Sequence, residues 1–309
     1  MRENGRVPTM NRAALLLVTV IWGVNFVSAR FALDAMTPWG FRAVSFGAGA
    51  AILFGLAPVL RVRLRLRRRI DLLHLAVAGT FGIAGFGVLS AVSLLNTTAG
   101  RTSIVVYTMP IWVAVLGRVW LGERLDGRRA VAVWIGVAGL AVLLLPLLRG
   151  EPSLGELAAL GAALSWALGT VYLKWAGVDA APLAITAWQV CAGAVVSAVA
   201  LALDGGPVFH AAPTAAAWAG IAYSTLIGTV FAYVLWFQVV QRLPASVAGL
   251  GTLLVPVFGM AAGMLMLGER PTIPDLVGFA LIFLAGLLAL GGPAGPASRT
   301  RSHGTERRT

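Results

Sequence analysis

PIWVAVLGRVWLGER, from Pro110 to Arg124, occurs a second time in the chain as PVFGMAAGMLMLGER, from Pro256 to Arg270. Six of the fifteen aligned positions are identical, and the two copies lie 146 residues apart. Upstream residues also correspond, at an offset of 144: Trp22 with Trp166, Arg30 with Lys174, and Pro38 with Pro182. The chain therefore contains two copies of one unit, each close to half of its 309 residues.

The composition is that of a membrane protein. Apolar residues make up 59% of the chain. Charged residues make up only 12%, whereas about a quarter of the residues in soluble domains are charged. Ten apolar stretches are long enough to cross a bilayer: 13–33, 39–60, 72–95, 102–121, 130–148, 155–175, 182–203, 215–237, 245–267 and 273–291. Runs such as LAVLLLPLL do not alternate as barrel strands do, so we expect an all-α polytopic membrane protein with ten transmembrane helices.

Each copy of the unit has five spans, so the second copy enters the membrane upside down relative to the first. We expect one repeat over 13–148, an inverted repeat over 155–291, and tails at 1–12 and 292–309. Inverted repeats are a recurrent construction of secondary transporters, because one bundle can open to either face around a site at mid-membrane. A duplication without transport is the alternative reading of the same pattern.

The basic residues predict the orientation. If the spans alternate, eighteen of the 24 Lys and Arg residues fall in loops and tails on one side, including the RVRLRLRRR loop at 61–69. Five lie on the other side. The positive-inside rule then places both termini in the cytoplasm of a cell (inner or plasma) membrane protein. The net charge of +12 therefore needs no nucleic-acid partner.

These features together resemble the EamA family of the drug/metabolite transporter superfamily. The resemblance rests on IWGVNFVSARFAL near the start, with a basic residue eight positions after the Trp. It also rests on the following Pro38 and Arg42, on the Pro-initiated fourth span that ends in LGER, and on their second-half counterparts. It covers about residues 13–291 and implies ten helices, cytoplasmic termini and export of small metabolites or drugs.

Polar and aromatic residues inside the spans are the candidates for substrate binding, because a polar group in a membrane helix is costly unless it faces protein or a wet cavity. Some share a helix face at i, i+3 or i+4 spacing. Each could instead anchor at the interface or bond a neighbouring helix. We predict that a midplane cavity is lined by seven of them: Trp22, Asn25, Tyr107, Trp166, Thr170, Thr229 and Tyr233.

A second group is predicted to act in structure or gating: Arg30, Arg42, Pro110, Glu123, Lys174, Pro256 and Glu269. Glu123 and Glu269, from the two LGER phrases, are predicted to latch a neighbouring helix end or an Arg, one at each membrane face. Arg30 and Lys174 close their spans and could snorkel or cap the last carbonyls. Arg42 has less room to escape and could attract an anionic group. Each proline removes a backbone N–H and frees a carbonyl.

Other chemistry is nearly absent from the sequence. There is no phosphate-binding G-x-x-x-x-G-K-[ST] loop, and the three histidines lie far apart, so we expect no ATP-driven engine, metal or other cofactor. All twelve acidic residues fall in loops or near span ends, which predicts poor handling of permanent cations.

The sequence therefore favours a secondary transporter, not an enzyme, whose partners are a small solute and the lipid bilayer. We expect it to export small metabolites such as amino acids by alternating access. The alternatives are export of drugs or other small solutes, a membrane scaffold, or a membrane-embedded enzyme. The coupling ion and the oligomeric state stay open.

Overall fold

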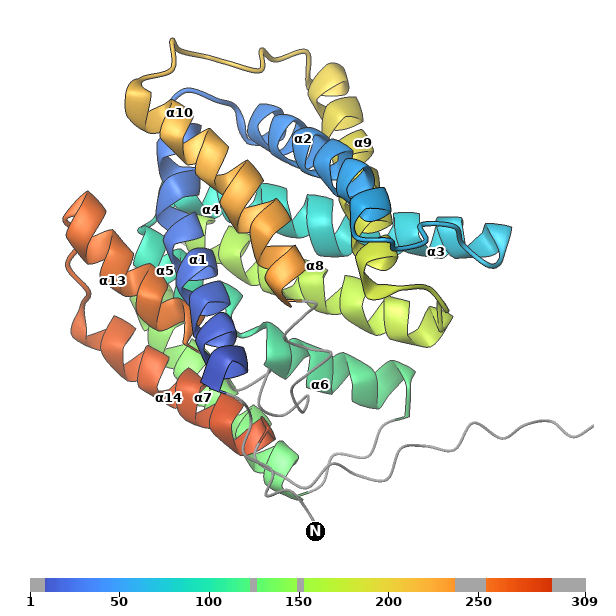
Figure 1. Cartoon of the computed structure of the whole chain (residues 1–309). Helices are drawn as coiled ribbons and strands as arrows, with labels where there is room; N and C mark the ends of the chain where they lie inside the picture. Colours follow the sequence, from blue (N-terminus) through green and yellow to red (C-terminus); the bar gives the residue numbers. More distant parts are fainter. Residues whose placement is uncertain (1–8, 123–126, 149–152, 237–253, 291–309) are drawn as a thin grey trace, which may run out of the picture.

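The computed structural model describes residues 9–122, 127–148, 153–236 and 254–290, and these parts form a bundle of helices (Figure 1). The first repeat contains α1 (Thr9–Leu33), α2 (Pro38–Val59), α3 (Arg69–Gly79), η1 (Thr80–Gly85), α4 (Phe86–Asn96), α5 (Ala99–Val106), α6 (Met109–Trp120) and α7 (Gly127–Leu148). The second contains α8 (Leu154–Ala176), α9 (Pro182–Asp204), α10 (Ala215–Ala222), η2 (Tyr223–Phe231), α13 (Val255–Leu267) and α14 (Ile273–Leu290).

The predicted ten spans are confirmed. Seven helices in the described parts are long and apolar enough to cross a membrane, and three shorter apolar helices accompany them. The third span is continuous through α3, η1 and α4, and the fourth combines α5 and α6. Residues 245–253 of the expected ninth span lie outside the described residues, and the span is described from α13 onward.

Local sequence signals set the helix ends. Thr37, Thr98 and Thr214 each accept a hydrogen bond from a backbone N–H three residues later, which satisfies a donor that the first turn leaves free. The glycines of both LGER phrases end their helices with a left-handed backbone, at φ 65° for Gly122 and 67° for Gly268. Glycine adopts this conformation without steric cost, so the repeated phrase contains a repeated helix terminator.

The helix packing is reciprocal between the two repeats. α1 packs against α10, η2 and α13 of the second repeat, whereas its counterpart α8 packs against α3, η1, α4 and α6 of the first. Two counterpart pairs face each other directly: α2 with α9, and α7 with α14. This is the pattern that a two-fold relation between the repeats produces, and the interface between them forms the middle of the bundle.

Both repeats contain a π-helical segment at the same place. η1 lies in the third span and η2 in the eighth, and Gly82 of η1 corresponds to Gly228 of η2 at the offset of 146. A Cβ added at Gly169 would lie 2.6 Å from the backbone nitrogen of Gly82, so α8 crosses η1 at close range. π-Helical insertions are rare and concentrate at functional sites, which draws attention to the space beside them.

Candidate functional site

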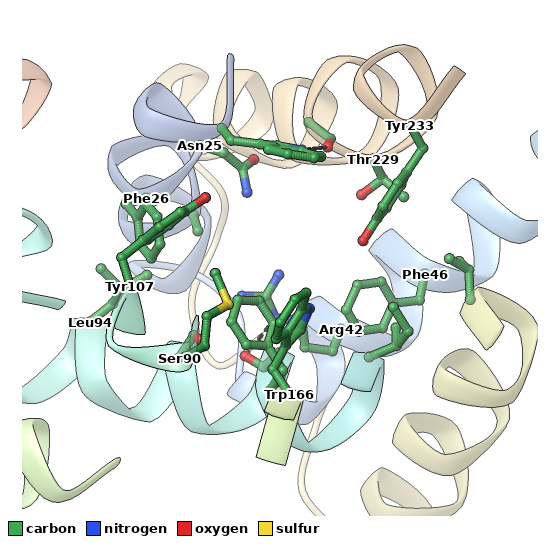
Figure 2. Close-up of a pocket in the computed structure, with 18 of the residues that line it drawn as sticks. Asn25, Phe26, Arg42, Phe46, Ser90, Leu94, Tyr107, Trp166, Thr229 and Tyr233 are labelled. Atoms are coloured by element: carbon green, nitrogen blue, oxygen red, sulfur yellow. Dashed lines mark hydrogen bonds between the residues drawn. The ribbon is translucent and has the colours of Figure 1, made fainter. Parts of the chain in front are cut away.

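A cavity of about 460 Å³ lies between the two repeats, beside both π-helical segments. Figure 2 shows its walls, with Asn25, Thr229 and Tyr233 on one side and Arg42 and Trp166 on the other. It is lined by Trp22, Asn25, Phe26, Ala29, Arg42, Phe46, Ile83, Phe86, Gly87, Ser90, Leu94, Tyr107, Met109, Pro110, Trp166, Val190, Gly228, Thr229, Tyr233 and Trp236. A space of this size and mostly apolar lining is typical of a small-ligand pocket.

Aromatic side chains from both repeats form much of the wall. The Trp22 ring centroid lies 5.4 Å from that of Trp236 and 6.0 Å from that of Tyr233. The indole nitrogen of Trp22 donates a hydrogen bond to the carbonyl of Gly228 at 3.2 Å, which ties α1 to η2 at the cavity. Trp166, the counterpart of Trp22, lines the cavity from α8. Rings held in this way can bury the apolar part of a solute.

The polar groups of the wall differ in their hydrogen bonding and in their accessibility. The Asn25 carbonyl oxygen Oδ1 and the Ser90 hydroxyl are buried and have no hydrogen-bonding partner in the described parts of the chain. The Thr229 hydroxyl, in contrast, donates to the carbonyl of Ser224 at 2.9 Å. Tyr107 and Tyr233 bring phenolic hydroxyls to the same space from the fourth and eighth spans. Protein covers the Asn25 and Ser90 oxygens, so the phenolic hydroxyls are the groups better placed to meet a solute.

Arg42 also lines the cavity, although the sequence placed it among the structural residues. Only 7% of it is exposed. Its Nε donates to the carbonyl of Gly87 at 2.9 Å, and its guanidinium carbon lies 4.6 Å from the ring centroid of Phe41 and 5.5 Å from that of Phe46. The cavity therefore has a fixed positive charge in its wall.

Thr170 is not among the lining residues. Its hydroxyl donates to the carbonyl of Trp166 at 2.9 Å, one turn back along α8, so its hydrogen-bonding capacity is used within its own helix. Its counterpart in the first repeat, at the offset of 144, is Phe26, which does line the cavity. The other six predicted binding residues all line this space.

The predicted structural residues are spread over the bundle. Pro110 lines the cavity, and Pro256 is buried in the first turn of α13. Arg30 forms an ion pair with Asp34 at the end of α1, and Lys174 lies in the last turn of α8. Glu123 lies outside the described residues. The apolar lining residues Phe46, Ile83, Phe86 and Trp236 were not predicted, because nothing in an apolar run distinguishes a cavity wall from a packed core.

Glu269 belongs to a largely buried charged group at one end of the bundle, which we call the Arg101 cluster: Arg101, Glu156, Glu269 and Asp275. Arg101 pairs with Glu156 at 2.7 Å and with Asp275 at 3.1 Å, and it donates to the carbonyl of Leu143 at 3.2 Å. Glu269 accepts hydrogen bonds from the backbone nitrogens of Ala99, at 2.5 Å, and Gly100, at 2.9 Å, and so caps α5. The cluster ties together α5, α7, α8, α13 and α14.

Two loops meet at the same end of the bundle. Met36, after α1, forms an antiparallel bridge with Phe209, after α9. The Thr37 nitrogen donates to the Val208 carbonyl at 3.2 Å, and the His210 nitrogen donates to the Ala35 carbonyl at 3.0 Å. The first and second repeats are therefore connected by backbone hydrogen bonds at this end as well as by the ion pairs.

Comparisons with known proteins agree with this architecture. The model of the EamA-like transporter family matches residues 12–145 and again residues 153–291. An "uncharacterized transporter" of Bacillus subtilis (strain 168) is 29% identical over 276 residues, which cover 87% of this chain and 92% of that protein. A "Probable amino-acid metabolite efflux pump" of Escherichia coli (strain K12) is 29% identical over 278 residues, 86% of this chain and 90% of that protein.

A solved crystal structure has the same fold. It superposes with a TM-score of 0.63 at 22% sequence identity, over 90% of this chain and 96% of the solved chain.

Proposed function

The chain belongs to the EamA-like transporter family, and from this premise we propose that it is a secondary transporter that exports small metabolites such as amino acids. The observation that carries the proposal is the cavity between the two repeats, which combines aromatic walls with polar side chains such as those of Tyr107, Tyr233 and Arg42. A relative that matches over most of its length bears the name of an amino-acid metabolite efflux pump, which supports the solute class.

Transport by this bundle is alternating access between the repeats. The reciprocal packing means that a rearrangement which opens one end can close the other with equivalent helices. At one end the Arg101 cluster and the Met36–Phe209 bridge hold both repeats together. With both termini in the cytoplasm, as the basic loops indicate, this closed end faces the outside of the cell membrane.

The cavity residues divide the recognition between them. Trp22 and Trp166 bury the apolar part of the solute from opposite repeats. Asn25, Tyr107 and Tyr233 provide hydrogen bonds that orient it, and the Thr229 oxygen, whose O–H already donates to Ser224, serves as an acceptor. Thr170 does not contact the solute and instead supports the helix turn at Trp166.

Reconstituted protein tests the transport proposal. Proteoliposomes are loaded with a panel of the twenty amino acids, and efflux and counterflow are measured with and without a pH gradient. We expect apolar amino acids to move faster than in protein-free vesicles, and Trp22→Ala or Trp166→Ala to slow them. Trp134→Ala is the matched control, because Trp134 is 74% exposed on α7 and away from the cavity. If folded protein moves no solute under any gradient, the proposal fails.

Cysteine labelling tests the orientation. In a Cys191→Ala background, Ile273→Cys places a thiol on a residue that is 77% exposed at the start of α14. Thr272 is a poorer position, because its hydroxyl caps α14 through Asp275. An impermeant maleimide should label the Ile273→Cys protein from outside, and an Arg67→Cys protein, whose thiol lies at the other end, only after permeabilisation. The reverse result would place the termini outside.

A further inference from the structure

Arg42 is the one ionised side chain among the cavity-lining residues that the structure describes. Asp and Glu are absent from this set of twenty. Of the described residues, only the Gly87 carbonyl accepts a hydrogen bond from Arg42, through Nε, which leaves both terminal nitrogens of the guanidinium without a protein partner. Figure 2 shows Arg42 directed toward the same hollow as Asn25 and Tyr233.

The surroundings of Arg42 hold the side chain in place and do not neutralise it. Gly87 makes room for it: an added Cβ there would lie 3.1 Å from the Arg42 Cδ and 2.8 Å from the Phe46 Cζ. Phe41 and Phe46 contact the guanidinium with their rings. Cation–π contacts stabilise a cation only partly, and a buried charge without a carboxylate is costly.

The second repeat departs from the first at these positions. The counterpart of Arg42, at the offset of 144, is Thr186, and the counterpart of Gly87, at the offset of 146, is Tyr233. A large polar side chain is thus placed on the second span in one repeat and on the eighth span in the other. The helices around the cavity are therefore related by a two-fold axis, but the charge is not. The positive group comes from the first repeat alone.

We propose that the guanidinium of Arg42 binds a carboxylate group of the transported solute. A guanidinium presents two parallel N–H donors that match the two oxygens of a carboxylate, and this pair is strong where water is excluded. The aromatic walls then receive the apolar side chain, while the phenolic oxygens of Tyr107 and Tyr233 offer acceptors for an ammonium group. The site takes an amino acid as a zwitterion, or another apolar carboxylate, and rejects simple cations.

This inference rests on the proposed function and specifies its solute class. The test uses wild-type protein, Arg42→Gln and Arg42→Lys in proteoliposomes. The probes are leucine, phenylalanine and methionine, their amides, which lack the carboxylate, and their 2-oxo acids, which keep the carboxylate and lack the ammonium group. Each compound is offered as a competitor of counterflow of the fastest-moving solute.

We expect the wild type to favour the amino acids over their amides by about tenfold or more, and Arg42→Gln to lose most of this preference together with the flux. Arg42→Lys keeps the positive charge but cannot present two parallel N–H donors. Its preference for carboxylates should lie between that of the wild type and that of Arg42→Gln. Arg30→Gln is the matched control, because Arg30 pairs with Asp34 away from the cavity and should leave the preference unchanged.

Gly87→Ala keeps the test decisive if Arg42→Gln does not fold. The added Cβ displaces the guanidinium while the charge stays, so the preference for carboxylates should weaken in folded protein. The inference fails if the wild type transports solutes but does not prefer carboxylates. It also fails if Arg42→Lys and Gly87→Ala both keep the full preference. In either case the proposed transport function is unaffected. If the wild type transports nothing, the proposed function fails with it.

Discussion

The two ends of the helix bundle are held by different interactions. At one end Arg101 is paired with Glu156 and Asp275, whose side chains are only 3% and 11% exposed, and Glu269 caps a helix of the other repeat. At the other end Arg67 pairs with Asp179 at 3.1 Å, but these side chains are 78% and 79% exposed. Ion pairs of similar length therefore occur in very different environments.

The difference in exposure shows at which end ion pairs stabilise the contact between the repeats in this conformation. A solvent-exposed pair contributes about 0–1 kcal/mol, because water solvates both charges almost as well as they solvate each other. A buried pair contributes weakly against an apolar replacement, but breaking it by removing one partner leaves a buried charge and costs about 3–5 kcal/mol. The Arg101 end is therefore the one held by ion pairs that are costly to break, whereas the repeats are joined at the Arg67 end by hydrogen bonds such as that from the Trp188 indole to the Leu64 carbonyl.

The largest expected effect comes from locking the Arg101 end. Met36 and Phe209 face each other as a narrow antiparallel pair, since the flanking hydrogen bonds belong to their neighbours, and such pairs have Cα atoms about 4.5 Å apart. This separation suits a disulfide. In a Cys191→Ala background, Met36→Cys with Phe209→Cys should stop transport when oxidised and recover it on reduction, as measured by counterflow.

The single variants Met36→Cys and Phe209→Cys are the controls, and both should transport under oxidising and reducing conditions alike. Full transport by the oxidised double variant, with the crosslink shown by mass spectrometry, would mean that this end does not open during the cycle.

The second prediction concerns the charge of the Arg101 cluster. Arg101→Gln leaves Glu156 and Asp275 buried without their cation, and we expect a loss of about 3–5 kcal/mol in stability. The loss is read as a lower melting temperature in detergent. Arg101→Gln combined with Glu156→Gln should be less destabilised than the two single changes added together, because the pair is removed as a unit. Strict additivity would show that Arg101 and Glu156 do not interact.

The third prediction concerns the cap on α5. Glu269→Gln replaces a carboxylate that accepts from two backbone N–H groups with an amide that has one acceptor oxygen, so one donor loses its partner. The charge also favours the helix N-terminus. We expect a loss of about 1–2 kcal/mol, smaller than that of Arg101→Gln. If the Glu269→Gln protein is as stable as the wild type, Glu269 does not stabilise the Arg101 end.

Much of the fold could be predicted from the sequence, because a bilayer allows few structures. The LGER repetition and the lengths of the apolar runs predict ten helices in two units, and both LGER glycines end helices as terminators. The π-helical segments η1 and η2 were not predicted, since one extra residue in a turn leaves no mark in an all-apolar run.

The site was harder to predict, because it depends on where side chains point after packing. The correspondence of Trp22 with Trp166 in the two repeats correctly indicated two residues of the cavity wall. Thr170 was predicted with them, but its hydroxyl donates to a carbonyl of its own helix, α8. The sequence placed Arg42 among the structural residues, and the hydrogen bond to the Gly87 carbonyl and the rings of Phe41 and Phe46, which hold it in the cavity wall, appear only after packing. Glu156 and Asp275 lie far from Arg101 in the sequence, so no local pattern joins them.

The smallest expected effect is at the other end of the bundle. Arg67→Gln removes one partner of an exposed pair, and water replaces the lost interaction, so stability should change by no more than about 1 kcal/mol. The difference in stability between Arg67→Gln and the wild type should shrink further when salt is added, since screening weakens the pair in the wild type. Asp179→Asn is the matched change on the opposite charge and should behave alike. A loss as large as that of Arg101→Gln would mean that the two ends are fastened equally, and the asymmetry proposed for the transport cycle would have to be given up.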